Sequence, residues 1–221
     1  QSLRHRLRSM INPQSATFHP LKRFSVTEAS KIYCPWAPAD DAVYRAYHDE
    51  EWGVPEYDSR ALWEKLQLDG FQAGLSWRTI LYKRDSMREE FDGFDPASIA
   101  RWDDERIDQA LQNPGIIRSP QKIRALIGNA KAYLAFNDEP QSFSEWMWDF
   151  VGGSPIVNSW ENFRDAPTNS EESAALSKAL KKRGFKYCGP VIVYAFMQAV
   201  GMINDHETVC PRHKAVQAYT R

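Results

Sequence analysis

Cysteine is scarce in this chain, and long apolar runs are absent. Three cysteines among 221 residues are too few and too scattered for the disulfide framework of a small secreted protein. This scarcity predicts a reducing compartment such as the cytoplasm. No apolar stretch approaches the roughly 20 residues that span a bilayer, so no membrane partner is expected. Strict alternation of apolar and polar residues is also missing, which argues against β-strands.

Net charge is nearly absent too, but the charges are unevenly distributed. The formal net charge is −1, whereas residues 1–27 carry five basic side chains and no acidic one, so this segment is +5 and the remainder is −6. Two prolines interrupt the segment, and it has no usable apolar period. We expect residues 1–32 to form a flexible basic arm, with an organelle transit peptide as the alternative. Residues 33–214 then form a single helical domain, and residues 215–221 form a tail.

From residue 33 onward, apolar residues recur at three- and four-residue steps, which predicts an all-α fold. Residues that can accept a hydrogen bond from a helix N-terminus stand where these patterns begin. The expected caps are Asp40 or Asp41, Asp58, Ser76, Asp95 and Asp104, with Asn169 and Glu172 as a capping box farther along. Behind the first cap, Tyr44, Tyr47 and His48 fall on one helical face.

A glycine-bounded hairpin stands between two predicted helices near the C-terminus. Gly184 ends the first helix, residues 185–189 form the hairpin, and Pro190 suits the first position of the next helix. Unpaired amides beside the positive end of that helix can hold a phosphate oxygen, and such contacts position a protein on DNA without reading its sequence. Basic side chains cluster here, at Lys178, Lys181, Lys182, Arg183 and Lys186. The alternative is an ordinary helical hairpin with a solvated basic face.

Two Cys/His pairs lie at opposite ends of the predicted domain. Cys34 and His48 are near its start, and His206 and Cys210 are near its end. Two thiolates and two imidazoles form the Cys2His2 set of a tetrahedral zinc site. The second pair has H-x-x-x-C spacing, which suits one helical face or one tight loop, whereas thirteen residues separate the members of the first pair. The alternative is two buried thiols and two hydrogen-bonded histidines.

Several longer segments carry a resemblance to a known family. They are Cys34-Pro-Trp36, Tyr47-His-Asp-Glu-Glu-Trp-Gly-Val-Pro55, Gln72-Ala-Gly-Leu-Ser-Trp77, Gly115-Ile-Ile-Arg118, Lys122-Ile123, Ile127-Gly-Asn-Ala130, Ala175-Leu-Ser-Lys-Ala-Leu-Lys-Lys-Arg-Gly-Phe-Lys186 and Asn204-Asp-His206. In these segments, which extend from about Cys34 to Cys210, the chain resembles the DNA-3-methyladenine glycosylase I family of the helix-hairpin-helix glycosylases. The resemblance implies an all-α fold in which two lobes flank a base pocket.

The resemblance also implies an activity and a pocket. An enzyme of this family turns N3-methyladenine out of double-stranded alkylated DNA and hydrolyses its N-glycosidic bond, which leaves an abasic site. The family's structural Zn²⁺ falls on the four Cys/His residues named above, and four protein ligands leave no open position on the metal. The base pocket falls on Tyr47, Trp52 and Trp77, with Trp36 and Tyr44 nearby. A cationic base favours such aromatic faces.

Asp69 departs from the family pattern, because familiar members have Glu at this position. It shares a helical face with two leucines and falls near a helix C-terminus, where the dipole disfavours an anion. A carboxylate in such a place is a candidate functional residue, so Asp69, Tyr47 and Trp77 are the expected catalytic residues. The alternative for Asp69 is a solvated residue beside Gly70. Asp205 is expected to be structural.

The expected DNA contacts lie in the hairpin, at Arg183, Gly184, Lys186 and Gly189, and the enzyme is expected to act as a monomer. No lysine stands out as a Schiff-base nucleophile, so a monofunctional hydrolase is predicted. Two rival hypotheses stay open. One is a non-catalytic or altered-specificity DNA-binding member of the same fold, marked by Asp69. The other is a zinc hydrolase of another substrate class, which needs an open coordination position.

Overall fold

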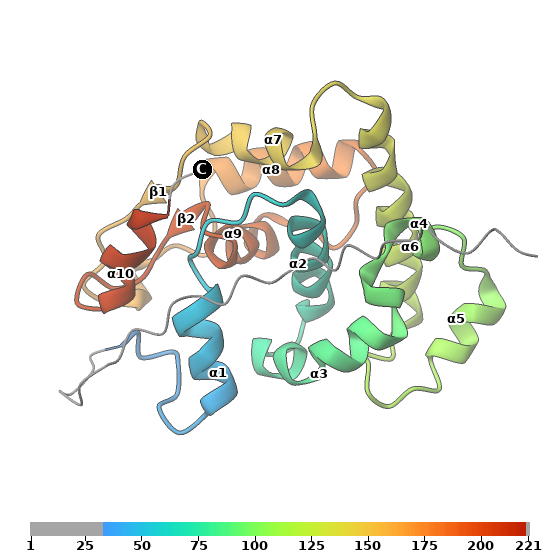
Figure 1. Ribbon diagram of the computed structural model, residues 1–221, viewed down its shortest axis with the longest axis horizontal. Coiled ribbons are helices and arrows are strands. Elements are labelled where there is room, and N and C mark those ends of the chain that lie inside the picture. The colour runs from blue at the N-terminus through green and yellow to red at the C-terminus, as the bar shows by residue number, and fades with distance from the viewer. Residues whose placement is uncertain (1–32, 220–221) are drawn as a thin grey trace, which may run out of the picture. The chain divides into compact units, whose positions relative to one another are not determined.

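Helices joined by short loops make up most of residues 33–219, which are the residues that the computed structural model describes (Figure 1). The α-helices are α1 (Ala42–Ala46), α2 (Ser59–Gln72), α3 (Trp77–Glu90), α4 (Pro96–Ile99), α5 (Asp104–Ala110), α6 (Pro120–Leu134), α7 (Phe143–Trp148), α8 (Glu171–Lys182), α9 (Pro190–Ala199) and α10 (Pro211–Ala215). A π-helical turn, η1 (Tyr47–Glu51), continues α1. Short 3-10 turns are η2 (Asp92–Phe94), η3 (Ala135–Asp138), η4 (Asp149–Val151), η5 (Phe163–Asp165) and η6 (Val216–Ala218). The predicted arm at 1–32 and the last two residues of the predicted tail lie outside the described residues.

The prediction of a mostly helical fold is confirmed, with one difference in detail. Two strands of two residues each, β1 (Ile156–Val157) and β2 (Ile203–Asn204), pair in parallel, with Ile156 opposite Ile203. No strand was expected. Two residues are too short to show an alternating pattern, so this pairing depends on contacts between distant segments rather than on a local signal.

Most of the predicted helix starts are confirmed. The side chains of Asp41, Asp58, Ser76 and Asp95 each accept a hydrogen bond from a backbone amide of the helix that follows. Asp103 rather than Asp104 caps α5, and the predicted capping box of Asn169 and Glu172 is wrong. Ser170 and Ser173 form that box, because Ser170 is the last non-helical residue before α8.

The predicted hairpin boundaries are also confirmed. Gly184 follows α8 with φ of +95°, a left-handed conformation that favours glycine, and Pro190 is the first residue of α9. In Figure 1, α2 lies in the middle of the domain, and it packs against α3, α6 and α9. Its apolar face includes Leu62 and Trp63, which are fully buried. None of the helices within residues 33–219 has the length and apolar character needed to cross a membrane.

Candidate active site

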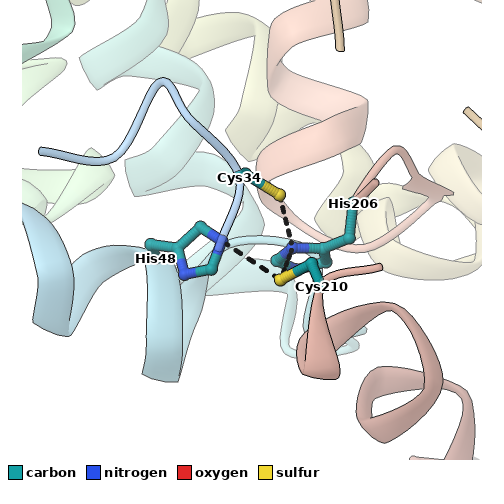
Figure 2. A group of neighbouring side chains, drawn as sticks. All are labelled: Cys34, His48, His206 and Cys210. Carbon is teal, nitrogen blue, oxygen red and sulfur yellow. Dashed lines mark hydrogen bonds between the residues drawn. The ribbon is translucent and has the colours of Figure 1, made fainter. Parts of the chain in front are cut away.

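Two cysteines and two histidines converge from the two ends of the domain, as Figure 2 shows. They are Cys34, His48, His206 and Cys210. All four are buried, and their donor atoms lie within 4.8 Å of one another. Cys34 Sγ is 3.5 Å from His206 Nδ1, and Cys210 Sγ is 3.7 Å from His206 Nδ1 and from His48 Nε2. A tetrahedron with Zn–S bonds of about 2.3 Å and Zn–N bonds of about 2.0 Å has S···N edges of about 3.5 Å. The spacing therefore fits a zinc ion.

The second nitrogen of each histidine ring also has a partner. His48, on η1, places Nδ1 2.7 Å from Asp49 Oδ1, and His206, after β2, places Nε2 3.0 Å from the Trp52 carbonyl oxygen. Such outer contacts orient imidazoles that bind a metal. Gly53 is required beside this ring: its φ is +78°, and a Cβ there would lie 2.9 Å from His206 Nε2. The local sequence after η1 thus fixes the orientation of a ligand 153 residues away.

The charge of the two thiols also favours a cation. Their mutual hydrogen bond raises the pKa of Cys34 and lowers the pKa of Cys210, so one thiol ionises far more readily than the other. Two thiolates side by side in a buried site repel each other, and a dication compensates both charges. The residues fit Zn²⁺ in donor type, spacing and charge. Because all four tetrahedral positions would be protein ligands, such an ion would have no place for a reacting water.

The five predicted pocket aromatics form a row that starts at this Cys/His cluster. Trp52 packs edge-on against one of the histidines, with ring centroids 4.5 Å apart, and against Trp36 at 4.7 Å. Ring contacts then continue from Trp36 to Tyr44 at 5.9 Å, from Tyr44 to Tyr47 at 6.3 Å, and from Tyr47 to Trp77 at 5.2 Å. Trp36 and Trp52 therefore support the histidines, whereas Tyr47 and Trp77 form the far end of the row.

Asp69 lies in the last turn of α2 and is 2% exposed, so the alternative of a solvated residue is wrong. Its carboxylate accepts hydrogen bonds of 2.8 and 2.7 Å from Lys65 Nζ. The same ammonium lies 4.1 Å from the centroid of the Trp77 ring. Burial raises the pKa of Asp69, and the Lys65 cation partly offsets this effect. Burial also raises the pKa of the Tyr47 hydroxyl, and the charge of Asp69 adds to that shift.

The hairpin lies against the C-terminal end of α2, at the residue that follows Asp69. Gly70 approaches the hairpin so closely that a Cβ would lie 3.3 Å from the Tyr187 carbonyl oxygen. Asn129 on α6 holds the hairpin from the other side. Its side chain donates to the Lys186 carbonyl oxygen at 3.1 Å and accepts from the Lys186 amide at 2.8 Å. The hairpin is therefore held at a defined place beside the pocket.

Arg183, one of the predicted DNA contacts, is held within the protein. Its guanidinium forms hydrogen bonds of 2.5 and 2.9 Å with the Glu139 carboxylate. It also lies over the rings of Phe136 and Trp146, 4.1 and 4.7 Å from their centroids. These contacts give Arg183 a structural role that the charge run did not indicate.

The other predicted DNA contacts differ in their exposure and in whether their backbone amides already have a partner. Lys186 has an exposed side chain, but its amide is bonded to Asn129. The Gly184 amide donates to the Lys181 carbonyl oxygen at 3.0 Å. Gly189 is the N-cap of α9. The Gly184 and Lys186 amides are therefore already paired, whereas Gly189 lies at the amino end of α9.

Asp205 has the structural role expected of it. Its carboxylate is 2% exposed and accepts four hydrogen bonds, each of 2.7 Å. The donors are Asn158 Nδ2, Trp160 Nε1, the Tyr194 hydroxyl and Gln198 Nε2. These contacts join α9 to the segments around β1 and β2.

Three residues near the site were missed from the sequence. Lys65 was detectable by its four-residue spacing from Asp69 on one helical face. Leu75 is 41% exposed in the loop between α2 and α3, directly after Gly74 with φ of +77°. Lys122 donates hydrogen bonds of 2.8 and 2.7 Å to two carbonyl oxygens at the C-terminal end of α2, and so anchors that loop. Only the tertiary structure brings Lys122 to this place.

A buried carboxylate next to aromatic faces, beside a hairpin between two helices, is the arrangement expected of a helical DNA glycosylase, an enzyme that acts on a base outside the stack. Residues 36–213 match the family described as methyladenine glycosylase. The chain belongs to the methyladenine glycosylase family.

Individual relatives agree with this assignment. The chain is 51% identical to DNA-3-methyladenine glycosylase of Haemophilus influenzae over 178 residues, which are 80% of this chain and 96% of the relative. A crystal structure of 3-methyladenine DNA glycosylase I is 49% identical with a TM-score of 0.80, covering 81% of this chain and 98% of that one. A tyrosine-to-phenylalanine variant of such an enzyme, solved in complex with 3-methyladenine, is 38% identical with a TM-score of 0.76, covering 78% and 92%.

Proposed function

We propose that this protein is a monofunctional DNA-3-methyladenine glycosylase, which hydrolyses the N-glycosidic bond of N3-methyladenine in DNA and leaves an abasic site. The names of its relatives and the base-bound neighbour support this activity. The observation that carries the proposal is the buried carboxylate of Asp69. The ammonium of Lys65 contacts both this carboxylate and the face of the Trp77 ring. Tyr47 packs on the same indole.

The chemistry needs little from the protein because the lesion is a good leaving group. N3-methyladenine in DNA already carries a positive charge, and breaking the bond from the sugar to N9 returns an electron pair that neutralises it. Water adds to the sugar carbon and loses a proton to solvent. Cation–π contacts with Trp77 and Tyr47 each contribute on the order of 1–2 kcal/mol to binding of the extruded cationic base in a desolvated site. Asp69 accepts a hydrogen bond from the edge of the base, strengthened by charge.

Lysine chemistry is not required for this reaction. A bifunctional enzyme would form a Schiff base between a neutral lysine and the abasic sugar. Lys65 is the buried lysine of the pocket, and although burial lowers its pKa, it is paired with both oxygens of Asp69. Hydrolysis without strand cleavage is therefore the expected outcome.

We further propose that alkylated duplex DNA is held by the start of α9 and by the exposed lysines of the hairpin region. Those lysines are Lys178, Lys181, Lys182 and Lys186. Gly189 presents the positive end of α9, which suits a phosphate. Because the body of the protein carries a small net negative charge, affinity depends on this local strip and falls with added salt.

Leu75 is proposed to fill the gap that an extruded base leaves. A large apolar side chain in a loop is stabilised when it leaves water, and apolar wedges commonly enter an opened base step. Leu75 is 41% exposed and stands two residues before Trp77. Lys122 anchors the loop that carries it. Leu75, as an apolar wedge, and the base pocket would therefore act at the same base step.

The four Cys/His residues are proposed to hold a structural Zn²⁺. The fit in spacing, burial and outer contacts supports this proposal. Through Trp52, the ion would stabilise the row of aromatics that ends at Trp77. The enzyme is further proposed to act as a monomer, with residues 33–214 as a single domain whose two lobes flank the base pocket.

The experiment that tests the function is release of methylated bases from alkylated duplex DNA. The wild-type protein should release 3-methyladenine without cutting the strand. Trp77→Ala should release it about 5- to 30-fold more slowly, because loss of one cation–π contact weakens binding of the extruded base. Binding to DNA without any release would instead support a non-catalytic DNA-binding member of the fold. Asp69 is one methylene shorter than the family's Glu, so the range of released bases should be measured in the same assay.

A further inference from the structure

The position over the Trp77 ring is occupied by a cation of the protein itself. Lys65 Nζ lies 4.1 Å from the ring centroid and is bonded to both oxygens of Asp69. The side chains of Lys65 and Asp69 are only 14% and 3% exposed. An aromatic face and a buried carboxylate are the two contacts that the proposed function assigns to the extruded base. The ammonium therefore stands where a cationic base would be recognised.

This pair is a poor stabiliser of the helix that carries it. A basic residue four positions before an acidic one is the less favourable order on a helix, and an anion near the C-terminus opposes the dipole. Burial of both charges adds a desolvation cost that a buried pair seldom recovers. Lys65 and Asp69 have all three disadvantages. A role in stability does not account for the pair, and a role in the pocket does.

We propose that Lys65 is a specificity-determining residue: it is the counter-ion of Asp69 in the free enzyme, which a cationic base can replace and a neutral base cannot. The inference rests on the proposed function and concerns the same pocket. When a cationic base enters, one positive charge replaces another and Asp69 stays paired. When a neutral base enters, either Lys65 stays and blocks the indole face, or it leaves and Asp69 is a buried carboxylate without a partner.

The surroundings of Lys65 fit this exchange. Glu51 and Arg84 are bonded to each other by two hydrogen bonds of 2.5 and 2.9 Å, so Arg84 is not free to replace Lys65 beside Asp69. The Glu51 carboxylate is 45% exposed and near enough to raise the pKa of Lys65. Because both Glu51 oxygens already accept from Arg84, the displaced ammonium would share this carboxylate with Arg84 at a place closer to solvent. Tyr47 is neutral because burial raises its pKa, so it adds no charge to the pocket.

Two non-cleavable probes of equal shape test the proposal. 3,9-Dimethyladeninium is a fixed cation with a methyl group in place of the sugar, and its 3-deaza analogue is neutral because carbon replaces N3. Affinities of both probes are measured by calorimetry at mildly alkaline pH, where N1 of the 3-deaza analogue carries no proton, for the wild-type protein, Lys65→Met and Lys65→Arg. Lys131→Met, which changes an exposed lysine on α6, is the matched control.

The wild-type protein, Lys65→Arg and the control should prefer the cationic probe by at least about tenfold. In Lys65→Met the indole face is free, and Asp69 can take up a proton and so accept a neutral partner. The neutral probe should then bind about tenfold more tightly than to the wild-type protein, and the preference for the cation should fall. Lys65→Gln removes the same charge and serves if the methionine variant does not fold.

Two results would overturn the proposal: an unchanged preference in both Lys65→Met and Lys65→Gln, or an equal loss of affinity for both probes. Failure of the proposed function looks different, because the wild-type protein would then bind neither probe. Binding of the cation by the wild-type protein, with the same preference after the lysine is replaced, removes this inference alone.

Discussion

Replacement of Asp69 by asparagine isolates the charge of the site at nearly constant shape. A carboxylate about 4 Å from the centre of a cationic base contributes about 4 kcal/mol at an effective dielectric constant of about 20. Asparagine still offers an oxygen acceptor, so part of the contact survives. The base loses its positive charge as the bond breaks, so this attraction serves to hold the extruded cation in the pocket, and losing most of it lowers occupancy of the pocket by about 10²- to 10³-fold. We expect Asp69→Asn to slow base release by that factor.

The same substitution has a second effect, on stability. It leaves the ammonium of Lys65 without its carboxylate in a pocket where it is 14% exposed. Breaking a fully buried pair costs about 3–5 kcal/mol, and partial access to solvent reduces this to about 1–3 kcal/mol. The variant should therefore melt at a lower temperature but stay folded at 25 °C.

Single-turnover release of 3-methyladenine from methylated duplex DNA is the assay, with thermal melting measured in the same buffer. Asp85→Asn is the matched control, because that side chain is 94% exposed on α3. Affinity for undamaged duplex should be unchanged, since the pocket is empty in that complex. Release at the wild-type rate by folded Asp69→Asn protein would refute the role given to this carboxylate.

The remaining predictions concern the metal, the wedge, the hairpin and pH. Chelation or Cys210→Ser should lower the melting temperature by roughly 5–10 °C, because the proposed ion would join the two ends of the domain, while release by the folded fraction should persist. Leu75→Ala should slow release from duplex DNA several-fold without changing affinity for free 3-methyladenine. Changing Lys182 and Lys186 together to Gln should lower the slope of log affinity against log salt by about 2. The pKa of Asp41 is lowered from its ordinary value of 3.8, chiefly by a backbone amide. Its stabilisation is therefore present above pH 3.8 and lost as pH falls through the lowered pKa, so Asp41→Asn should lower the melting temperature at pH 7 but not at the lowest pH.

Each of these has a control and a contrary result. Cys188→Ser lies outside the Cys/His cluster, and an equal loss of metal from it would contradict the assigned ligands. If Leu75→Ala releases the base from duplex DNA at the wild-type rate, the proposed role of Leu75 as an apolar wedge is wrong. Arg183→Gln should leave the salt slope unchanged, since its charge is paired with Glu139, and a drop of about 1 would show that it binds a phosphate. A melting difference for Asp41→Asn that is constant with pH would show that its charge is not involved.

Local signals in the sequence were sufficient to predict where most helices begin and where the hairpin lies. Asp58 and Ser76 cap helices as predicted, since capping depends on a few adjacent residues. The hairpin between Gly184 and Pro190 is confirmed for the same reason. The box at Ser170 was misplaced by one residue, because neighbouring polar residues can all act as caps until the exact start of the helix is known.

The candidate site was only partly predictable. Residue type and spacing indicated the Cys/His set, and the structure brings all four donors together. The family resemblance and the unfavourable place of Asp69 on a helix both predict a functional residue. Burial excludes the solvated alternative, and the functional role stays a prediction. The charge run predicts Arg183 as a DNA contact but does not indicate its ion pair, because charge runs look alike whether their members are solvated or paired. Its partner Glu139 is 44 residues away, so no local pattern reveals the pairing.

By itself, the sequence determined the helical class, the hairpin, the four candidate metal ligands and the family resemblance. Each of these depends on residue types at short spacing along the chain or on long segments that match the family. The tertiary structure decided which side chains from distant segments meet and how deeply their charges are buried. Lys65 and Asp69 are neighbours on one helix, yet only the packing of α3 against α2 places the face of Trp77 under the same ammonium. Electrostatic energy depends on distance and burial in space, and neither quantity can be read from positions along a chain.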